Sequence, residues 1–426
     1  MKIRTLTLGI SLLRRDFTST DIIDCIFSSA IKSLTIVQEK VIQAGYEVQT
    51  LRLALNPFED WIDFDDFTSN LIILDGILTK YNIGFCSVGS VSEPDLIKWI
   101  PDIIKFSGKF YASVSVGAPA EIGNIPVIDV RACHAAAKVM KEISHDVNDR
   151  LAGFNFCVTF NCPKNIPFFP ASTHVSSHDN LLTVGLENAD LLFIACHAVR
   201  DPVAARDNLV SVLYQALKPL DSLISDACTA TGINYGGIDP SICPGLELPV
   251  DSVGLAIEEL INTVTCDPTI TPTSTAATDR FLSQYFGSHG TMRAISVITS
   301  ALHMLKECKE SERNDEKKVN LPFKITGYCG VMLPVMEDRI LAERLLTGYG
   351  SYDNPKPTYT VKDLIAYSTV CGVGLDTVPI SGDVTEDALV GVFVDLCTVA
   401  FRLNKPLSCR YVSRVLPMCI LIRPQH

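Results

Sequence analysis

The first half of the chain alternates between strand-like and helix-like segments. The strand-like segments are rich in Val, Ile, Phe and Thr, and read KIRTLTLGIS, EVQTLRLALN, IGFCSVGSV, KFYASVSVG, GFNFCVTFN and LLTVGLEN. Between them, Ser19 and Thr20 can cap a helix that ends at Gly45, and further helix patterns cover 66–81, 94–106 and 130–147. Apolar strands separated by helices predict an α/β fold with a mostly parallel sheet, open or closed, covered by helices.

The middle of the chain is predicted to be helical, from VRDPVAARDNLVSVLYQALKPLDSLISDACTATG to RAISVITSALHMLKE. A strand, FKITGYCGVML, helices near 336–346, 361–371 and 385–401, and a last strand, LSCRYVSRV, are expected to follow. There is no low-complexity linker and no repeat of fixed period. We therefore expect a single α/β domain over residues 1–426, and the mixed-sign run KECKESERNDEKK predicts a charged surface loop at 306–320.

Charge and hydropathy exclude several classes of partner. The net charge is −12 and the sequence pI about 5.2, with no basic stripe to neutralise phosphates, so we expect no nucleic-acid partner. No apolar run reaches the roughly 18–20 residues that span a bilayer, so no membrane partner is expected either. The N-terminal apolar run is interrupted by Arg4 and followed by Arg14 and Arg15, which favours a first strand over a signal peptide.

The 15 cysteines are scattered singly through apolar segments, and no CxxC occurs. This usage is typical of reduced thiols in a core, and it predicts a cytoplasmic protein. The chain also lacks GxGxxG, GxxxxGK[ST] and HExxH, so no bound organic cofactor is expected. The adjacent glycines of NYGGID (234–239) are interpreted as a turn.

Histidines and acids suggest a site, but they leave alternatives open. In HVSSH (174–178), which is predicted to be a loop, His174 lies beside a strand-end segment and is a candidate proton-handling residue. A metal site would instead require three of a wider set to converge. That set is His174, His178, Glu187, Asp239, Glu337 and Asp376.

Two acidic pairs are more informative. In GYCGVMLPVMEDRILAER, Glu337 and Asp338 open a helix-like segment, where the helix dipole favours carboxylates, but a strand end could also place one in a cleft with a raised pKa. In GLDTVPISGD (374–383), Asp383 fits a helix N-cap, with Glu386 three residues on. Asp376 has no such structural role in a predicted strand end or tight turn, so it is the better catalytic candidate.

Several blocks along the chain resemble, in order, those of the domain of unknown function 711 family. They include RTLTLGISL, NIPFFPAS with VGLENAD, INYGGIDPS, FGSHGTMRAISVITSAL, TGYCGVMLPVMED and CGVGLDTVPISGD with LNKPLS. The resemblance implies an α/β barrel like those of pyruvate formate-lyase and the anaerobic ribonucleotide reductases, with ten strands around a central site. Radical chemistry does not carry over, because SRVLPMC stands where a glycyl-radical loop would be and no Cys-Cys pair exists.

The family has no agreed reaction, so the function must be predicted from the residues. A barrel would bring the polar strand-end residues together although they are far apart in sequence. We predict an enzyme that uses carboxylate acid/base chemistry on a small polar metabolite, as a lyase, hydrolase or condensing enzyme. Asp376, Glu337 and His174 are the predicted catalytic residues, and the predicted substrate-binding residues are Asn161, Glu187, Asp239, Asp338 and Asp383.

Two other functions stay open: a protein that binds a metabolite without turning it over, and a metal-dependent hydrolase. A variant of the enzyme uses a nucleophilic cysteine, since Cys329 and Cys371 lie beside the acidic blocks, although a core thiol is the favoured interpretation of both. The expected partner is a small-molecule substrate, and we expect a homo-oligomer, as is common for enzymes of this size.

Overall fold

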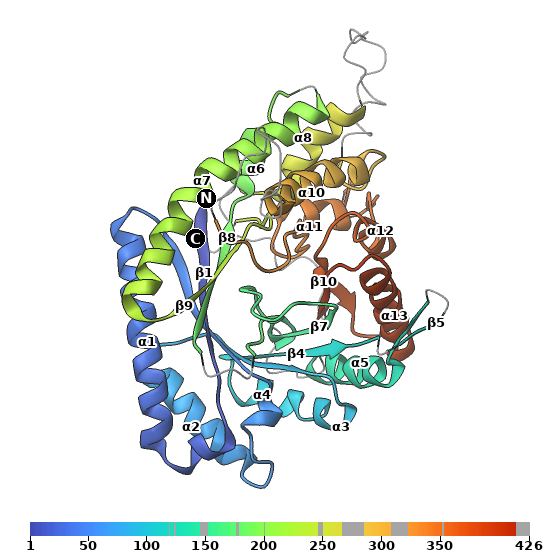
Figure 1. The fold of residues 1–426 in the computed structure, drawn as a ribbon. Helices are drawn as coiled ribbons and strands as arrows, with labels where there is room; N and C mark the ends of the chain where they lie inside the picture. Colours follow the sequence, from blue (N-terminus) through green and yellow to red (C-terminus); the bar gives the residue numbers. More distant parts are fainter. Residues whose placement is uncertain are drawn as a thin grey trace, which may run out of the picture.

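Most strands of the chain join one curved sheet in the computed structural model (Figure 1). The structure describes residues 1–118, 120–122, 125–144, 152–175, 179–199, 201–245, 250–265, 285–307, 323–351 and 353–414. The strands are β1 (Lys2–Ile10), β2 (Val48–Leu55), β3 (Cys86–Val91), β4 (Phe110–Val116), β5 (Ala120–Ile122), β6 (Ile125–Val127), β7 (Phe156–Phe160), β8 (Leu181–Glu187), β9 (Asn234–Asp239), β10 (Gly374–Ser381) and β11 (Leu407–Arg414).

The main sheet has nine strands among the described residues, in the order β10-β11-β7-β4-β3-β2-β1-β8-β9. The five strands from β7 to β1 are mutually parallel. On each side the direction reverses once, because β8 is antiparallel to β1 and β11 is antiparallel to β7. Strand β3 is buried along its whole length, as the predicted apolar run requires for a sheet covered on both faces.

Single bridging pairs connect the two edge strands of this sheet. Ile238 of β9 pairs with Ile325, Ile242 pairs with Val331, and Pro334 pairs with Asp376 of β10. All three pairs are parallel. The segment predicted as the strand FKITGYCGVML therefore makes only isolated bridges, and the prediction of a continuous strand there was wrong. Two of its residues have positive φ, Gly327 at 78° and Cys329 at 51°, which breaks the extended conformation.

Helices cover the outer face of the sheet (Figure 1). They are α1 (Thr20–Gln43), α2 (Phe67–Lys80), α3 (Pro94–Ile97), α4 (Ile100–Phe106), α5 (Val130–Ser144), α6 (Ala189–Cys196), α7 (Pro202–Thr231), α8 (Val253–Thr265), α10 (Thr291–Glu307), α11 (Arg339–Leu346), α12 (Val361–Tyr367) and α13 (Glu386–Arg402), with short 3₁₀ turns η1 (Arg14–Thr18), η2 (Phe58–Asp60) and η3 (Ala152–Asn155).

Most sequence-based boundaries agree with these elements. Ser19 caps α1 as predicted, with its side chain accepting from the backbone N–H of Asp21. The helix predicted over 94–106 is two short helices, α3 and α4, and NYGGID is strand β9 rather than a turn. The helical middle is confirmed as α7, α8 and α10, although β9 divides it, and α6 before it was not predicted. The predicted loop at 306–320 lies almost wholly outside the described residues.

The connection between β7 and β8 lies in the middle of the curved sheet (Figure 1). It is tied to the inner strands by hydrogen bonds. The Thr7 hydroxyl of β1 donates to the carbonyl of Pro167 at 2.8 Å, and the Ser87 hydroxyl of β3 donates to the carbonyl of Ser172 at 2.5 Å. The backbone N–H of His174 donates to the carbonyl of Leu55 at 2.9 Å. The sheet interior is therefore partly filled by a polypeptide segment, which limits the space left for a ligand.

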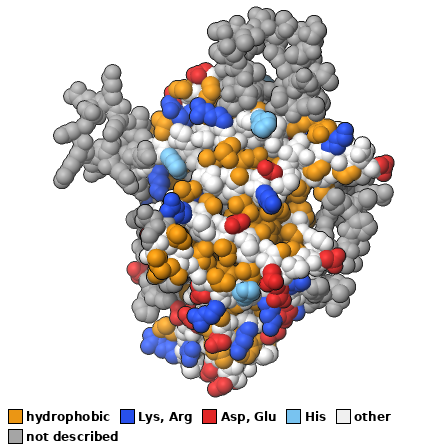
Figure 2. All heavy atoms as spheres, turned by 90° about the vertical axis from the view of Figure 1, so that its right-hand side faces the viewer, with side chains coloured by type: hydrophobic (Ala, Val, Ile, Leu, Met, Phe, Trp, Pro, Cys, Tyr) orange, Lys and Arg blue, Asp and Glu red, His pale blue; other side chains and the backbone are white. Residues whose placement is uncertain are grey.

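The outer surface bears charges of both signs. Figure 2 shows the face that lies to the right in Figure 1, with hydrophobic side chains over its centre and acidic and basic side chains intermixed toward its lower edge. Among the described residues, no helix combines the length and the apolarity that crossing a membrane would require.

Gly374, at the start of β10, is predicted to be irreplaceable by alanine. Its φ is +96°, and a Cβ there would lie 2.2 Å from the carbonyl oxygen of Ser408 on the neighbouring strand. We expect Gly374→Ala to lower the free energy of unfolding by about 2 kcal/mol or more, measured by urea denaturation. Gly391 in α13 is the matched control, because its Cβ would meet nothing within 4 Å. Gly391→Ala should raise stability by about 0.5–1 kcal/mol, and equal effects at both positions would contradict the prediction.

Candidate functional site

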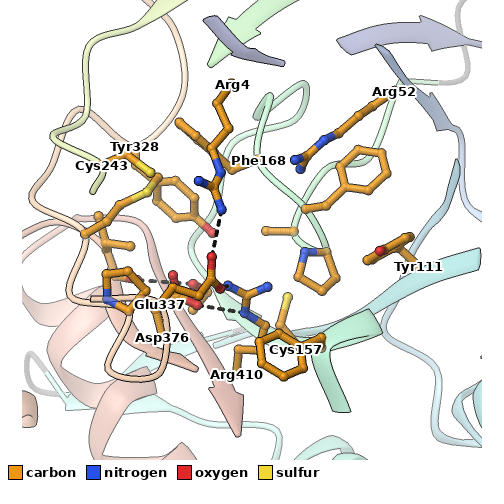
Figure 3. Close-up of a pocket in the computed structure, with 18 of the residues that line it drawn as sticks. Arg4, Arg52, Tyr111, Cys157, Phe168, Cys243, Tyr328, Glu337, Asp376 and Arg410 are labelled. Atoms are coloured by element: carbon orange, nitrogen blue, oxygen red, sulfur yellow. Dashed lines mark hydrogen bonds and ion pairs between the residues drawn. The ribbon is translucent and has the colours of Figure 1, made fainter. Parts of the chain in front are cut away.

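A cavity of about 280 Å³ lies at the centre of the sheet, where side chains from β1, β2, β4, β10 and β11 meet (Figure 3). Its lining combines charged and aromatic groups. The charged residues are Arg4, Arg52, Glu337, Asp376 and Arg410, and the aromatic ones are Phe85, Tyr111, Phe154, Phe168, Phe169 and Tyr328. The cavity therefore brings two of the three predicted catalytic residues, Glu337 and Asp376, to one place.

Asp376 lies at a β-bulge between β10 and β11. Leu375 pairs with Cys409 and Val378 pairs with Tyr411, so two residues of β10, Asp376 and Thr377, stand opposite the single residue Arg410. Across the bulge, Arg410 Nε donates to Asp376 Oδ1 at 2.7 Å. Bulges re-aim side chains and are common beside active sites. The segment GLDTVP, predicted as a strand end or a tight turn, is thus an irregular strand that directs Asp376 into the cavity.

Thr377, the second residue of the bulge, has an unusual backbone conformation. Its φ is 43°, a region that β-branched residues rarely adopt, and its side chain is fully buried. Such outliers cost on the order of 1–3 kcal/mol and cluster at functional sites. The strained residue, Thr377, is therefore the direct neighbour of the residue that carries the carboxylate, Asp376.

Glu337 is held by two arginines. Arg4 Nη2 donates to its Oε2 at 2.7 Å, and Arg410 Nη2 donates to its Oε1 at 2.7 Å. Glu337 precedes α11, and its neighbour Asp338 is the N-cap of that helix, accepting from the N–H groups of Ile340 and Leu341. The sequence left two roles open for this acidic pair, a helix start and a cleft. Asp338 has the first role, and Glu337 faces the cavity.

Arg410 links the two carboxylates, and their environments move their pKa values in opposite directions. Burial raises the pKa of Asp376, and the Glu337 charge adds to this against the opposing pull of Arg410. For Glu337, burial acts upward, but the charges of Arg410 and Arg4 outweigh it and lower the pKa. When the pKa values of two neighbouring acids are shifted apart in this way, one acid can stay ionised while the other exchanges a proton.

Arg52 lies on the opposite wall of the cavity (Figure 3). Its guanidinium carbon is 4.9 Å from the ring centroid of Phe85 and 5.3 Å from that of Phe169. Tyr111 packs against both rings, at centroid distances of 5.7 and 5.2 Å. The three rings form one aromatic cluster, and the Arg52 guanidinium packs on two of them. Burial, with the charge of Arg4, lowers the pKa of Arg52 to about 10, which still leaves it cationic at neutral pH.

Glu187 and Asp239 lie outside the cavity lining. Glu187 is buried behind Arg4, 3.6 Å from its Nη1, and accepts from the Gln49 side chain at 2.6 Å. Asp239 is fully buried and accepts from the backbone N–H groups of Ser241, Tyr328 and Cys329 and from the Ser241 hydroxyl. Its contacts fix the segment that carries Tyr328, so its role is to position rather than to touch a ligand in the cavity.

His174 and Asn161 are also away from Asp376. The His174 ring Nδ1 is 2.7 Å from Asn165 Oδ1 and Nε2 is 3.1 Å from the Asp179 carbonyl, and burial lowers its pKa. It borders a separate surface depression with Tyr235 and Lys324. Asn161 donates to the side chain of Asn404 at 3.1 Å. The prediction that His174 and Asn161 converge with Asp376 was wrong, because the β7–β8 connection carries His174 past the cavity.

Asp383 is an exposed turn residue, and the prediction that it caps the following helix was wrong. The N-cap of α13 is Thr385, whose hydroxyl accepts from the Ala388 N–H at 3.2 Å. Glu386, expected as the third residue of a capping box, is the first residue of the helix. Asp383 therefore contacts neither the cavity nor the helix cap.

Metal ligands and reactive thiols find little support in the described part of the chain. No group of three or more His, Cys, Asp or Glu side chains there could hold a metal ion, and His178 lies outside the described residues. Cys329 and Cys371 are buried away from the cavity, and burial raises the pKa of each thiol. Both are protonated at neutral pH, which favours the interpretation as core thiols.

The sequence-based prediction of site residues did not include the three arginines of the cavity. Each interrupts an otherwise strand-like segment: Arg4 in KIRTLTLGI, Arg52 in VQTLRLAL and Arg410 in LSCRYVSR. Arginine is almost never fully buried unless it is paired. A cation inside an apolar strand of a covered sheet is therefore a signal that could have found them.

Comparison with known families accounts for almost the whole chain. The family model described as "Uncharacterised ACR (DUF711)" matches residues 1–418. The chain belongs to the DUF711 family. This confirms the resemblance carried by the sequence blocks.

Two curated relatives of this DUF711 chain are distant in sequence. A "UPF0210 protein" of Pyrobaculum islandicum is 22% identical over 88% of this chain and 75% of its own length. Another, from Corynebacterium glutamicum, is 22% identical over 97% of this chain and 83% of its own length. Among solved structures, an anaerobic ribonucleotide reductase aligns with a TM-score of 0.42 and 11% identity, over 94% of this chain and 62% of the reductase chain.

Proposed function

We propose that this DUF711 protein is an enzyme that transforms a small metabolite by proton transfer to or from Asp376. The observation that carries the proposal is the pair of acids joined by Arg410, with the pKa of Asp376 raised and that of Glu337 lowered. A carboxyl group with a raised pKa lies closer to neutrality, where acid/base catalysis is most efficient.

Each charged group has a distinct part in this proposal. Asp376 takes a proton from the substrate or returns one to it. Glu337 stays ionised and orients Arg4 and Arg410, because it pairs with both guanidinium groups. Arg410, adjacent to Asp376, stabilises negative charge that develops on the substrate as the proton moves. This division of labour suits a lyase, a hydrolase or a condensing enzyme, and it assigns no step to His174.

The wider setting is part of the same proposal. The parallel bridges at Ile325, Val331 and Pro334 support a closed barrel in which residues 325–334 occupy the place of a tenth strand. Every cysteine in the described part of the chain is a free thiol, which supports a working place in the reducing cytoplasm. A homo-oligomer stays a prediction, which light scattering on the purified protein would test.

A search for turnover tests the proposal. The purified protein is incubated with an extract of small metabolites, and loss of substrate and gain of product are followed by mass spectrometry. We expect conversion by the wild type and by Asp383→Asn, whose acid is exposed and remote, but not by Asp376→Asn. If the wild type retains a metabolite without converting it, the protein is a non-catalytic binder and the enzymatic proposal fails.

A further inference from the structure

We propose that Arg52 binds an oxyanion, a carboxylate or a phosphate, that forms part of the substrate. This inference rests on the proposed function, because it assigns the opposite end of the same cavity to substrate recognition. It adds a chemical class to the substrate: a small metabolite that bears an anionic group at a distance from the atom where the proton is transferred.

The first argument is the pairing of charges. Of the three guanidinium groups that line the cavity, Arg4 pairs with Glu337, and Arg410 pairs with both Glu337 and Asp376. Glu187, behind the lining, adds a second carboxylate to Arg4. Among the described residues, Arg52 has no carboxylate within 4.0 Å, and its side chain donates one hydrogen bond, from Nε to the Thr50 hydroxyl at 3.0 Å. The Nη groups are thus left to face the cavity.

The second argument is burial. Arg52 is only 9% exposed, and a guanidinium at this depth is costly because it has lost much of its hydration and no carboxylate of the described residues lies within 4.0 Å of it. The rings of Phe85 and Phe169 stabilise a cation, but they accept no N–H hydrogen bonds of ordinary strength. A planar fork of free N–H donors suits the bidentate recognition of a carboxylate or a phosphate.

The third argument is the placement of Arg52 relative to the proton-transfer group. Arg52 comes from β2 and Asp376 from β10, and Figure 3 shows them on opposite walls. A cavity of about 280 Å³ is near the lower end of the size range of ligand pockets, which favours a metabolite of a few carbons over a nucleotide. An anion bound at Arg52 would therefore fix one end of a short substrate while its other end faces Asp376.

The test measures anion binding to the purified full-length protein. Inorganic phosphate, acetate, pyruvate and succinate are titrated by calorimetry and by thermal unfolding against wild type, Arg52→Met and Arg52→Lys. We expect the wild type to bind at least one of these anions, and Arg52→Met to bind it about 10- to 100-fold more weakly, the loss expected for hydrogen bonds to charged groups. Arg52→Lys, which keeps the charge without the fork, should fall between them.

Controls separate recognition from folding and from catalysis. Arg131→Met, at a side chain that is 86% exposed, should bind as the wild type does. Without anion, Arg52→Met should melt no lower than the wild type, since it removes an unpaired buried charge. Binding to phosphate alone would identify a phosphorylated substrate, and binding to carboxylates alone a carboxylic acid.

Equal affinity of wild type and Arg52→Met, or no binding of any of the four anions to the wild type, would overturn the inference. Anion binding that depends on Arg52, in a protein without Asp376-dependent turnover, would leave the inference standing while the proposed enzymatic function fails.

Discussion

Arg410→Met is expected to lower the free energy of unfolding by about 3–5 kcal/mol at neutral pH, the range measured when one partner of a buried ion pair is removed. Arg410 pairs with both Glu337 and Asp376 at 2.7 Å, and its own side chain is 13% exposed. Without it, Asp376 would lose its ion pair and Glu337 would keep only the pair with Arg4. Urea denaturation at neutral pH measures the effect.

The pH dependence of this loss follows from the direction of the pKa shifts. In the wild type, Arg410 and Arg4 lower the pKa of Glu337, so its contribution to stability is present above its ordinary pKa and is lost as the pH falls. In Arg410→Met, both acids should have raised pKa values, so the variant should lose stability as the pH rises through them. The deficit should therefore shrink toward about pH 4–5.

A triple variant provides the decisive control for Arg410. Arg410→Met with Glu337→Gln and Asp376→Asn removes the uncompensated charges and should recover most of the lost stability. Arg131→Met, at an exposed side chain, should have almost no effect. If Arg410→Met alone were as stable as the wild type, the assignment of Arg410 as the group that holds the two acids would be wrong.

Asp376→Asn is expected to lower kcat/KM by about 10²- to 10⁴-fold on the substrate found in the metabolite search, the usual contribution of a positioned acid or base. Stability should change little, because asparagine keeps an oxygen that accepts from Arg410 Nε. Glu337→Gln keeps the proton-transfer group, so its loss of rate should be smaller. That loss should come from weaker orientation of Arg4 and Arg410.

The pH–rate profile distinguishes the role of Asp376. Because burial raises its pKa, the profile should show a limb above the ordinary aspartate value of about 3.9. A rate that increases with pH along that limb identifies Asp376 as a general base, and a rate that decreases identifies a general acid. The limb should be absent from the residual activity of Asp376→Asn. A limb unchanged in that variant would show that another group carries the proton.

Local patterns predicted most of the elements, and the failures that matter for the site are long-range. The alternation that forms β1 to β4 with α1 to α5, and the serine that caps α1, are encoded within short segments. The segment 325–334 has the composition of a strand, but Gly327 and Cys329 adopt positive φ where Asp239 fixes the backbone, a partner some 90 residues away in sequence. No local pattern carries that information.

The candidate site was predicted in part for the same reason. Asp376 was identified as an acid without a structural role, Glu337 as an acid that a strand end could place in a cleft, and the two do meet. His174 and Asn161 were grouped with them because they follow strands, but both lie on the β7–β8 connection, which places their side chains away from Asp376. The sheet order determines which arginines face which acids. Arg4, Arg52 and Arg410 come from three different strands, β1, β2 and β11. Only the assembled sheet places them around one cavity.

The bulge at Asp376 and Thr377 has a further consequence for comparing members of the family. Two residues on β10 match one on β11, so the phase of the strand depends on their number. A relative that retains Asp376 and Arg410 but has lost one residue between Leu375 and Val378 would have a regular strand, with its carboxylate directly opposite the arginine and without the re-aiming that the bulge provides here. The length of the GLDTVP block is therefore as diagnostic of this site as the identity of its acid, and an insertion or deletion there would mark a relative with different chemistry.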